Sequence, residues 1–385
     1  MTSRVLLRTA ALLAALLAAA PALRAESRAE EDVTPLALAR GADLVVVASA
    51  LGPDTAPPRA GVLGTLRVEE VLRGAAAPAA LLEVAGDPAL TDARLPEGRR
   101  CVAFLERRAD GAFEPRGGAL GLVAVGEAPP GQEEPTLALV RAVVLETPSR
   151  VLPALVRAAA APGRFQSGAA LDLLREPGLL GGISDADGER LAAAFASTPS
   201  RDRARAHLAR LLGRLAPEGA VVLLVDAVLA EDGDPLKGAV GLALRDLGDD
   251  GAARLLAERT AGADAARRAR AAAVLGLSGL PGARSPLEAL LGSAEPEVRV
   301  EAASALGLLR APESAPALLR RLRGVPGGPA AEADTVARRA LLWALAQTDA
   351  PEGWEALRAV AADGADSERR FAEETLLNPR RPFVP

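Results

Sequence analysis

Side chains that commonly catalyse reactions or bind metals are scarce in this 385-residue chain, which contains one His and one Cys. His207 stands in the segment RARAHLARLL with no Cys or second His nearby, so the segment lacks the ligand spacing of a zinc site. Cys101 stands in an apolar run, where a thiol is expected to be a buried small hydrophobic group rather than a nucleophile. The sequence therefore predicts no catalytic residue, no metal and no cofactor, and a chain that is not an enzyme.

The acidic segment Asp185 to Glu189 (DADGE) is the nearest approach to a calcium loop. If Gly188 occupied the sixth position of an EF-hand, Ile183 and Ala194 would stand at the first and twelfth positions, which require carboxylates. We instead expect a helix that begins here with acidic residues in its first turn.

Two dense groups of arginine and one tryptophan are the candidates for contact with a partner. Arginine groups commonly form a solvated helix face, and their alternative role is to contact an acidic patch on a partner. Tryptophan is enriched where protein interfaces are strongest, although Trp343 adjoins an apolar helical stripe and is expected in the core. The candidate partner-binding residues are Arg267, Arg268, Arg270, Arg320, Arg321 and Trp354.

The formal net charge of -5 argues against nucleic acid as the main partner, because nucleic-acid-binding surfaces are strongly basic. The expected partner is therefore a protein or a peptide. The composition leaves the oligomeric state open.

Most of these residues must be positioned by helices. In residues 297–324, an apolar stripe at Val298, Ala302, Leu306 and Leu309 follows helical spacing. Gly307 and Pro312 weaken and then end that helix, and a second apolar stripe follows. The unit is a helix, a short turn and a second helix.

The same stripe recurs along the chain at intervals of 31 to 39 residues. Loops at 178–189 and 324–334 account for the two longest intervals. A repeated pair of helices cannot bury its apolar stripe alone, so the units must stack into an α-solenoid. The leucines that mark the repeat are Leu174, Leu212, Leu244, Leu275, Leu306, Leu345 and Leu376.

The segment EVRVEAASALGLLRAPESAPALLRRLR resembles a HEAT repeat of the short bacterial, phycobilisome-lyase-like type. The matching pieces are Val298-Arg299, Ala302-Ala303, Leu306-Gly307 and Leu318-Leu319. The repeat and the scarcity of catalytic residues together predict a non-catalytic, protein-binding scaffold. The resemblance also implies an alternative, an enzyme of the HEAT-like lyase type, although it carries no catalytic residue onto this chain.

Short apolar runs separated by Gly, Pro and Asp precede the solenoid and predict a small all-β barrel or sandwich. The expected strands lie within 42–52, 62–74, 80–86, 99–108 and 119–127. Residues 68–74 (VEEVLRG) and 97–105 (EGRRCVAFL) resemble a netrin-type OB barrel. This resemblance implies a second alternative, a protease inhibitor acting through the β-module, although a single Cys permits no internal disulfide.

The first residues are typical of a secretory signal peptide: Arg4 and Arg8 precede an apolar run, and small residues end at Ala25. Cleavage after Ala25 would lower the net charge by three. No later segment is apolar for long enough to cross a membrane. We therefore expect an exported protein, periplasmic or secreted.

The predicted fold is an α+β multidomain chain. It consists of a signal peptide (1–25), a β-rich module (26–130) and a HEAT-like α-solenoid of about seven helix pairs plus a terminal helix (131–385).

Overall fold

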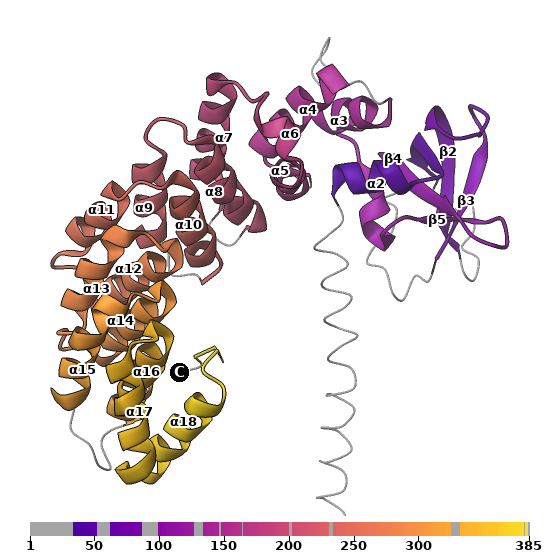
Figure 1. Cartoon of the computed structure of the whole chain (residues 1–385). Coiled ribbons are helices and arrows are strands. Elements are labelled where there is room, and N and C mark those ends of the chain that lie inside the picture. Colours follow the sequence, from indigo (N-terminus) through magenta and orange to yellow (C-terminus); the bar gives the residue numbers. More distant parts are fainter. Residues whose placement is uncertain are drawn as a thin grey trace, which may run out of the picture. The chain divides into compact units, whose positions relative to one another are not determined.

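The chain forms two compact units, Met1–Gly182 and Ile183–Pro385 (Figure 1). The predicted signal peptide (1–25) and most of the Pro-rich segment before the solenoid (127–133) lie outside the described residues. The computed structural model describes residues 34–51, 62–86, 99–126, 134–145, 148–163, 165–199, 202–230, 234–324, 332–380 and 382–383.

The first unit contains a closed β-barrel. Strand β1 pairs with both β2 and β4, so the ring β1–β2–β3–β5–β4 closes on itself, with β6 added beside β4. The pairing of β3 with β5 is parallel and the others are antiparallel. This is a five-stranded Greek-key barrel of the OB type. The strands are β1 (Leu44–Ala50), β2 (Val62–Arg73), β3 (Leu81–Ala85), β4 (Arg100–Arg107), β5 (Phe113–Pro115) and β6 (Leu122–Ala124).

Closure decides between the two β-architectures that the sequence allowed, a barrel and a sandwich. The sequence did not predict β5, because three residues ending in Pro115 carry too little periodicity to identify a strand. The last expected strand (119–127) is shorter in the structure, since a 3-10 turn, Gly118–Gly121, precedes β6.

Strand β1 is buried on both faces. Leu44, Val46 and Ala48 belong to the core cluster inside the barrel. The alternate residues Val45 and Val47 point outward, and yet their exposed fraction is 0%. The outer face of β1 must therefore be covered by other elements of the unit.

Helices α2 (Pro35–Gly41) and α3 (Pro135–Val144) pack on the outside of the barrel. Arg73 at the end of β2 donates to the carbonyl oxygens of Ala39 in α2 and Val144 in α3. Arg141 of α3 pairs with Glu70 of β2 at 2.5 Å. These contacts attach two helices to the surface of the barrel: α2, which precedes the barrel in the sequence, and α3, which follows it.

Helix α5 (Gln166–Arg175) is joined in turn to α2. The Oδ2 atom of Asp172 accepts a hydrogen bond of 2.9 Å from the N–H of Leu36, and Arg40 pairs with Glu176 at 2.8 Å. The first unit thus extends beyond residue 130, where the sequence places the domain boundary, because α3 packs on the barrel and α4 to α6 pack on α2, α3 and one another. The remaining helices of this unit are α4 (Pro148–Ala160) and α6 (Pro177–Leu180).

The second unit is a helical solenoid, drawn from brown to yellow in Figure 1. Its helices follow one another as pairs: α7 (Asp185–Ser197) and α8 (Arg203–Leu215), α9 (Ala220–Ala230) and α10 (Asp234–Leu247), α11 (Gly251–Thr260) and α12 (Ala265–Ser278), α13 (Arg284–Leu290) and α14 (Pro296–Leu309), α15 (Ala315–Gly324) and α16 (Glu332–Thr348), α17 (Pro351–Asp363) and α18 (Asp366–Leu377).

The second helix of each pair packs closely on the second helix of the next. A Cβ on Gly213 of α8 would lie 2.5 Å from Cα of Ala243 in α10, and one on Gly276 of α12 would lie 2.6 Å from Cα of Ala305 in α14. Glycine permits this approach because it has no Cβ. Leu174 and Leu376 are half-buried, whereas the other repeat-marking leucines, Leu212, Leu244, Leu275, Leu306 and Leu345, are at most 1% exposed, as the sequence predicted.

A basic residue stands seven positions before each of these buried leucines, a regularity that the sequence analysis missed. These basic residues are Arg205, Lys237, Arg268, Arg299 and Arg338. Three of them donate to backbone carbonyls at or beyond the end of the preceding helix: Arg205 to Thr198 (2.8 Å), Arg299 to Ala294 (2.6 Å) and Arg338 to Leu322 (3.0 Å). A cation at a helix C-terminus stabilises the unpaired carbonyls there.

Candidate binding groove

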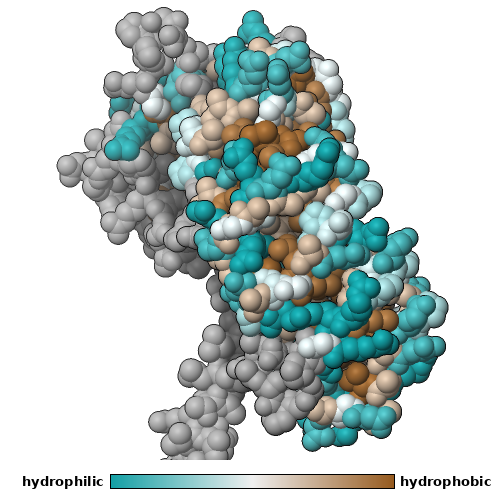
Figure 2. All heavy atoms as spheres, turned by 90° about the vertical axis from the view of Figure 1, so that its left-hand side faces the viewer, coloured by the Kyte–Doolittle hydropathy of each residue, from teal (hydrophilic) through white to brown (hydrophobic). Residues whose placement is uncertain are grey.

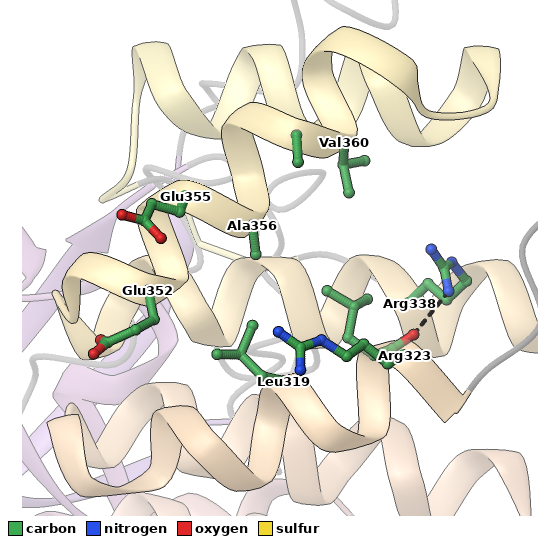
Figure 3. Close-up of a pocket in the computed structure, with 9 residues that line it drawn as sticks. Leu319, Arg323, Arg338, Glu352, Glu355, Ala356 and Val360 are labelled. Carbon is green, nitrogen blue, oxygen red and sulfur yellow. Dashed lines mark hydrogen bonds between the residues drawn. The ribbon is translucent and has the colours of Figure 1, made fainter.

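A groove of about 640 Å³ runs between α15 and α17 in the second unit (Figure 3). Leucines line the α15 side and small side chains line the α17 side. Because Ala356 and Ala359 are short, α17 does not fill the space opposite Leu319 and Leu322. The lining residues are Leu319, Leu322, Arg323, Arg338, Glu352, Glu355, Ala356, Ala359 and Val360.

The groove lies in the layer formed by the first helices of the pairs. Figure 2 shows the face on which α11, α13 and α15 lie, and hydrophobic furrows alternate there with hydrophilic ridges. Leu255 of α11, Leu290 of α13 and Leu319 of α15 are half-buried, so the apolar side chains of these first helices are only partly covered. Apolar surface of this kind is available for contact with another molecule.

The groove carries charges of both signs. Glu352 and Glu355 lie together near the start of α17, and Arg323 starts in the last turn of α15 and points back along that helix toward Leu319 (Figure 3). No residue in the described part of the chain forms an ion pair with any of these three side chains. These charges are therefore available to a ligand.

Arg338 differs from these three residues because its contacts are internal. It pairs with Glu368 of α18 at 2.7 Å, and the two side chains are 12% and 5% exposed. It also donates to the carbonyl oxygen of Leu322. Arg338 thus holds α15, α16 and α18 together at the edge of the groove.

The three predicted arginines of α12 make contacts within the solenoid. Arg267 lies 3.8 Å from Asp264, Arg268 pairs with Glu295 at 2.9 Å, and Arg270 donates to the carbonyl oxygen of Leu229 at 3.3 Å. Two of these contacts reach other helix pairs. The structure therefore gives Arg268 and Arg270 a role in joining repeats, and their predicted role in partner binding stays a prediction.

The remaining predicted residues lie on the two helices that form the groove. Arg320 is exposed and Arg321 half-buried on α15, and neither lines the groove. Trp354 is half-buried on α17, and its indole Nε1 donates to Asp349 at 3.0 Å. Trp343 is 7% exposed, which confirms the prediction that it packs in the core.

Sequence analysis did not identify the residues that line the groove. Their spacing on α17, at 352, 355, 356, 359 and 360, does place them on one helical face. That spacing also describes a buried stripe, and only the position of α15 shows that this face is partly open.

The residues considered for catalysis or metal binding lie apart from the groove. Cys101 is buried in β4, as predicted, and burial raises the pKa of its thiol to about 11. His207 is half-buried on α8. Asp185 and Asp187 begin α7 behind the N-cap Ser184, which confirms the helix start expected there.

The described residues contain neither a metal-binding cluster nor a membrane-spanning helix. Within these residues, no group of three or more His, Cys, Asp and Glu side chains is placed to hold a metal ion. Nor does any helix in the described part of the chain combine the length and hydrophobicity needed to span a bilayer.

Comparison with known families identifies the repeated unit. The family described as HEAT repeats matches residues 252–328. This segment of the chain is built of HEAT repeats. The HEAT segment begins in α11 and extends past the end of α15, so one wall of the groove belongs to it.

Solved structures similar to the chain include other helical proteins. Human deoxyhypusine hydroxylase in complex with glycerol is 19% identical, with a TM-score of 0.24, over 58% of this chain and 94% of that chain. The complex of CpcE and CpcF of phycocyanin lyase from Nostoc sp. PCC7120 is 21% identical, with a TM-score of 0.28, over 68% of this chain and 94% of that chain. No curated protein matches the chain in sequence.

These structures correct one prediction. The scarcity of His and Cys predicted a chain that is not an enzyme, yet the similar solved structures are named as a hydroxylase and a lyase. At TM-scores of 0.24 and 0.28, neither activity transfers to this chain.

Proposed function

We propose that the solenoid is a scaffold that binds a protein or peptide through the groove between α15 and α17. The observation that supports this function best is the partly open apolar floor of Leu319, Ala356 and Val360 beside unpaired charges. Burying such a floor against a partner would remove apolar surface from water, which drives most protein association. Charges at the rim would orient the partner.

The stacked repeats suit this role mechanically. The two pairs that form the groove are joined by the ion pair between Arg338 of α16 and Glu368 of α18, and Arg338 also donates to the carbonyl oxygen of Leu322 in α15, so the walls of the groove are held in place. A preformed site loses less conformational entropy on binding than a site that must be ordered.

A test of this function is to fill the groove. Ala359→Trp places a large side chain at an exposed position of the groove wall, and Arg358→Trp places the same side chain at the neighbouring exposed position outside it. The full-length protein and both variants would be used as bait in an extract of the cells that make it. We expect a partner to be retained by the native chain and by Arg358→Trp and to be lost with Ala359→Trp. Equal retention by all three would refute the assignment of binding to this groove.

We also propose that the protein is exported, periplasmic or secreted, on the basis of the signal-like segment that ends at Ala25. Mass spectrometry of the protein isolated from its own cells tests this directly. An N-terminus at or near Glu26 is the expected result, and an intact chain confined to the cytoplasm would contradict export.

A further inference from the structure

The groove is short, which limits what it can hold. The lining residues of α17 lie between Glu352 and Val360, nine residues that span a rise of about 12 Å along the helix axis. An extended peptide covers this length with about four residues. The groove therefore fits a short linear segment.

The groove keeps charges of both signs even after the helix dipoles are included. The N-terminus of α17 carries about half a positive charge, but Glu352 and Glu355 place two carboxylates there. The C-terminus of α15 carries about half a negative charge, which the one guanidinium of Arg323 exceeds. The start of α17 is thus net negative, and the Arg323 guanidinium, which points back toward Leu319, is a separate positive group on the α15 wall (Figure 3).

Around these charges the floor is aliphatic. Leu319, Leu322 and Val360 surround the small side chains Ala356 and Ala359, and these five residues carry no side-chain donor or acceptor. A polar side chain placed over this floor would lose hydrogen bonds to water without replacement. The middle of the ligand must therefore be apolar.

We infer that the groove binds a peptide segment in which aliphatic residues stand between a basic residue at one end and an acidic residue at the other. The basic residue contacts Glu352 and Glu355, and the acidic residue contacts Arg323. This inference rests on the proposed function and adds to it the chemistry of the partner.

A library of random dodecapeptides displayed on phage, selected on the immobilised full-length protein, tests this order of residues. The same selection on Ala359→Trp identifies the peptides that need the groove. We expect the groove-dependent peptides to share a basic residue and an acidic residue separated by aliphatic residues.

The enriched peptide would then be synthesised and its affinity measured by fluorescence anisotropy. We expect Glu352→Gln, Glu355→Gln and Arg323→Gln each to weaken binding by up to about fivefold, the range of an exposed ion pair. Glu373→Gln changes an exposed acid of α18 that does not line the groove, and it should leave the affinity unchanged. A chain with Glu352→Lys and Glu355→Lys should prefer a peptide with an acidic residue in place of the basic one.

Two outcomes would overturn the inference in different ways. Groove-dependent peptides without this charge order, or with affinities indifferent to the three charge substitutions, would refute the partner chemistry and leave the proposed function standing. If every enriched peptide bound Ala359→Trp as well as the native chain, or if no peptide were enriched, peptide binding in this groove would be refuted together with the inference.

Discussion

Single residues set the spacing between helices of the solenoid, and Gly276 is the clearest case. Its backbone touches Ala305 so closely that any Cβ would overlap that residue. The neighbouring atoms include the backbone of α14, which cannot turn aside as a flexible side chain could.

Gly276→Ala should therefore destabilise the solenoid by about 1–3 kcal/mol, the usual cost of overpacking a core. Urea unfolding followed by circular dichroism measures this as a lower midpoint with an unchanged slope.

Gly238→Ala is the matched control, because Gly238 lies in α10 with no atom within 4 Å of an added Cβ. Alanine there should raise the free energy of unfolding by up to about 1 kcal/mol, since glycine is the poorer helix former. If the two variants had the same unfolding midpoint, the close contact between Gly276 and Ala305 would not determine the effect of a substitution on stability.

Asp172 is the second residue whose environment has a measurable consequence. It is 4% exposed, and burial raises the pKa of its carboxyl from 3.8 to about 6, although hydrogen bonds from Thr34 and Leu36 and the charges of Arg175 and Arg40 lower it. The folded chain therefore keeps a proton on Asp172 over a pH range in which the unfolded chain loses it.

This difference predicts the direction of a pH effect. Between about pH 4 and pH 6 the folded state binds more protons at this site than the unfolded state, so the contribution of Asp172 to stability falls as the pH rises through that window. Asp172→Asn cannot titrate and should remove this contribution. Thermal unfolding of both chains at pH 4, 5, 6 and 7 tests it, and a constant difference in Tm across the series would contradict the assignment.

At the scale of elements, buried ion pairs hold particular helices together. The side chains of Arg338 and Glu368 are 12% and 5% exposed, and they join α16 to the first turn of α18. A buried charge that loses its partner is costly, because the protein interior solvates it poorly.

Glu368→Ala should therefore lower the free energy of unfolding by about 3–5 kcal/mol. Arg369→Ala, which breaks the neighbouring pair with Asp366, should cost about 1 kcal/mol or less, because those side chains are 41% and 81% exposed. Chemical denaturation of the two variants compares them directly. Equal losses would show that the Arg338–Glu368 pair is as well hydrated as a surface pair.

At the scale of the whole molecule, the division into units determines where the chain can be cut. In the first unit α3 packs on the barrel and α4 to α6 pack on α2, α3 and one another, and the outward-facing Val45, Val47 and Phe104 are 0% exposed. A chain of residues 26–182 retains these helices, whereas a chain of residues 26–130 loses them and exposes apolar barrel surface.

We expect the chain of residues 26–182 to be monodisperse in size-exclusion chromatography and to unfold cooperatively on heating, and the chain of residues 26–130 to aggregate. If the shorter chain were equally well folded, the barrel would be independent of the helices, as the boundary predicted from the sequence implies.

The sequence by itself determined the local elements and their repetition. Helical stripes with a period near 30 residues located the pairs, and the leucines Leu212, Leu275 and Leu306 identified the buried positions. Four of the six strands coincide with the apolar runs from which they were predicted, and β6 occupies part of the fifth run. These features depend on which residues are near one another in the chain, and periodicity reports that directly.

Only the tertiary structure decided which faces remain open and which distant residues meet. The groove depends on the positions of α15 and α17, and closure of the barrel depends on the pairing of β1 with β4. The attachment of α5 to α2 depends on Asp172 and Leu36, which are 136 residues apart. A periodic pattern specifies which face of an element is apolar, but not what packs against it, because that depends on contacts between residues far apart in the sequence.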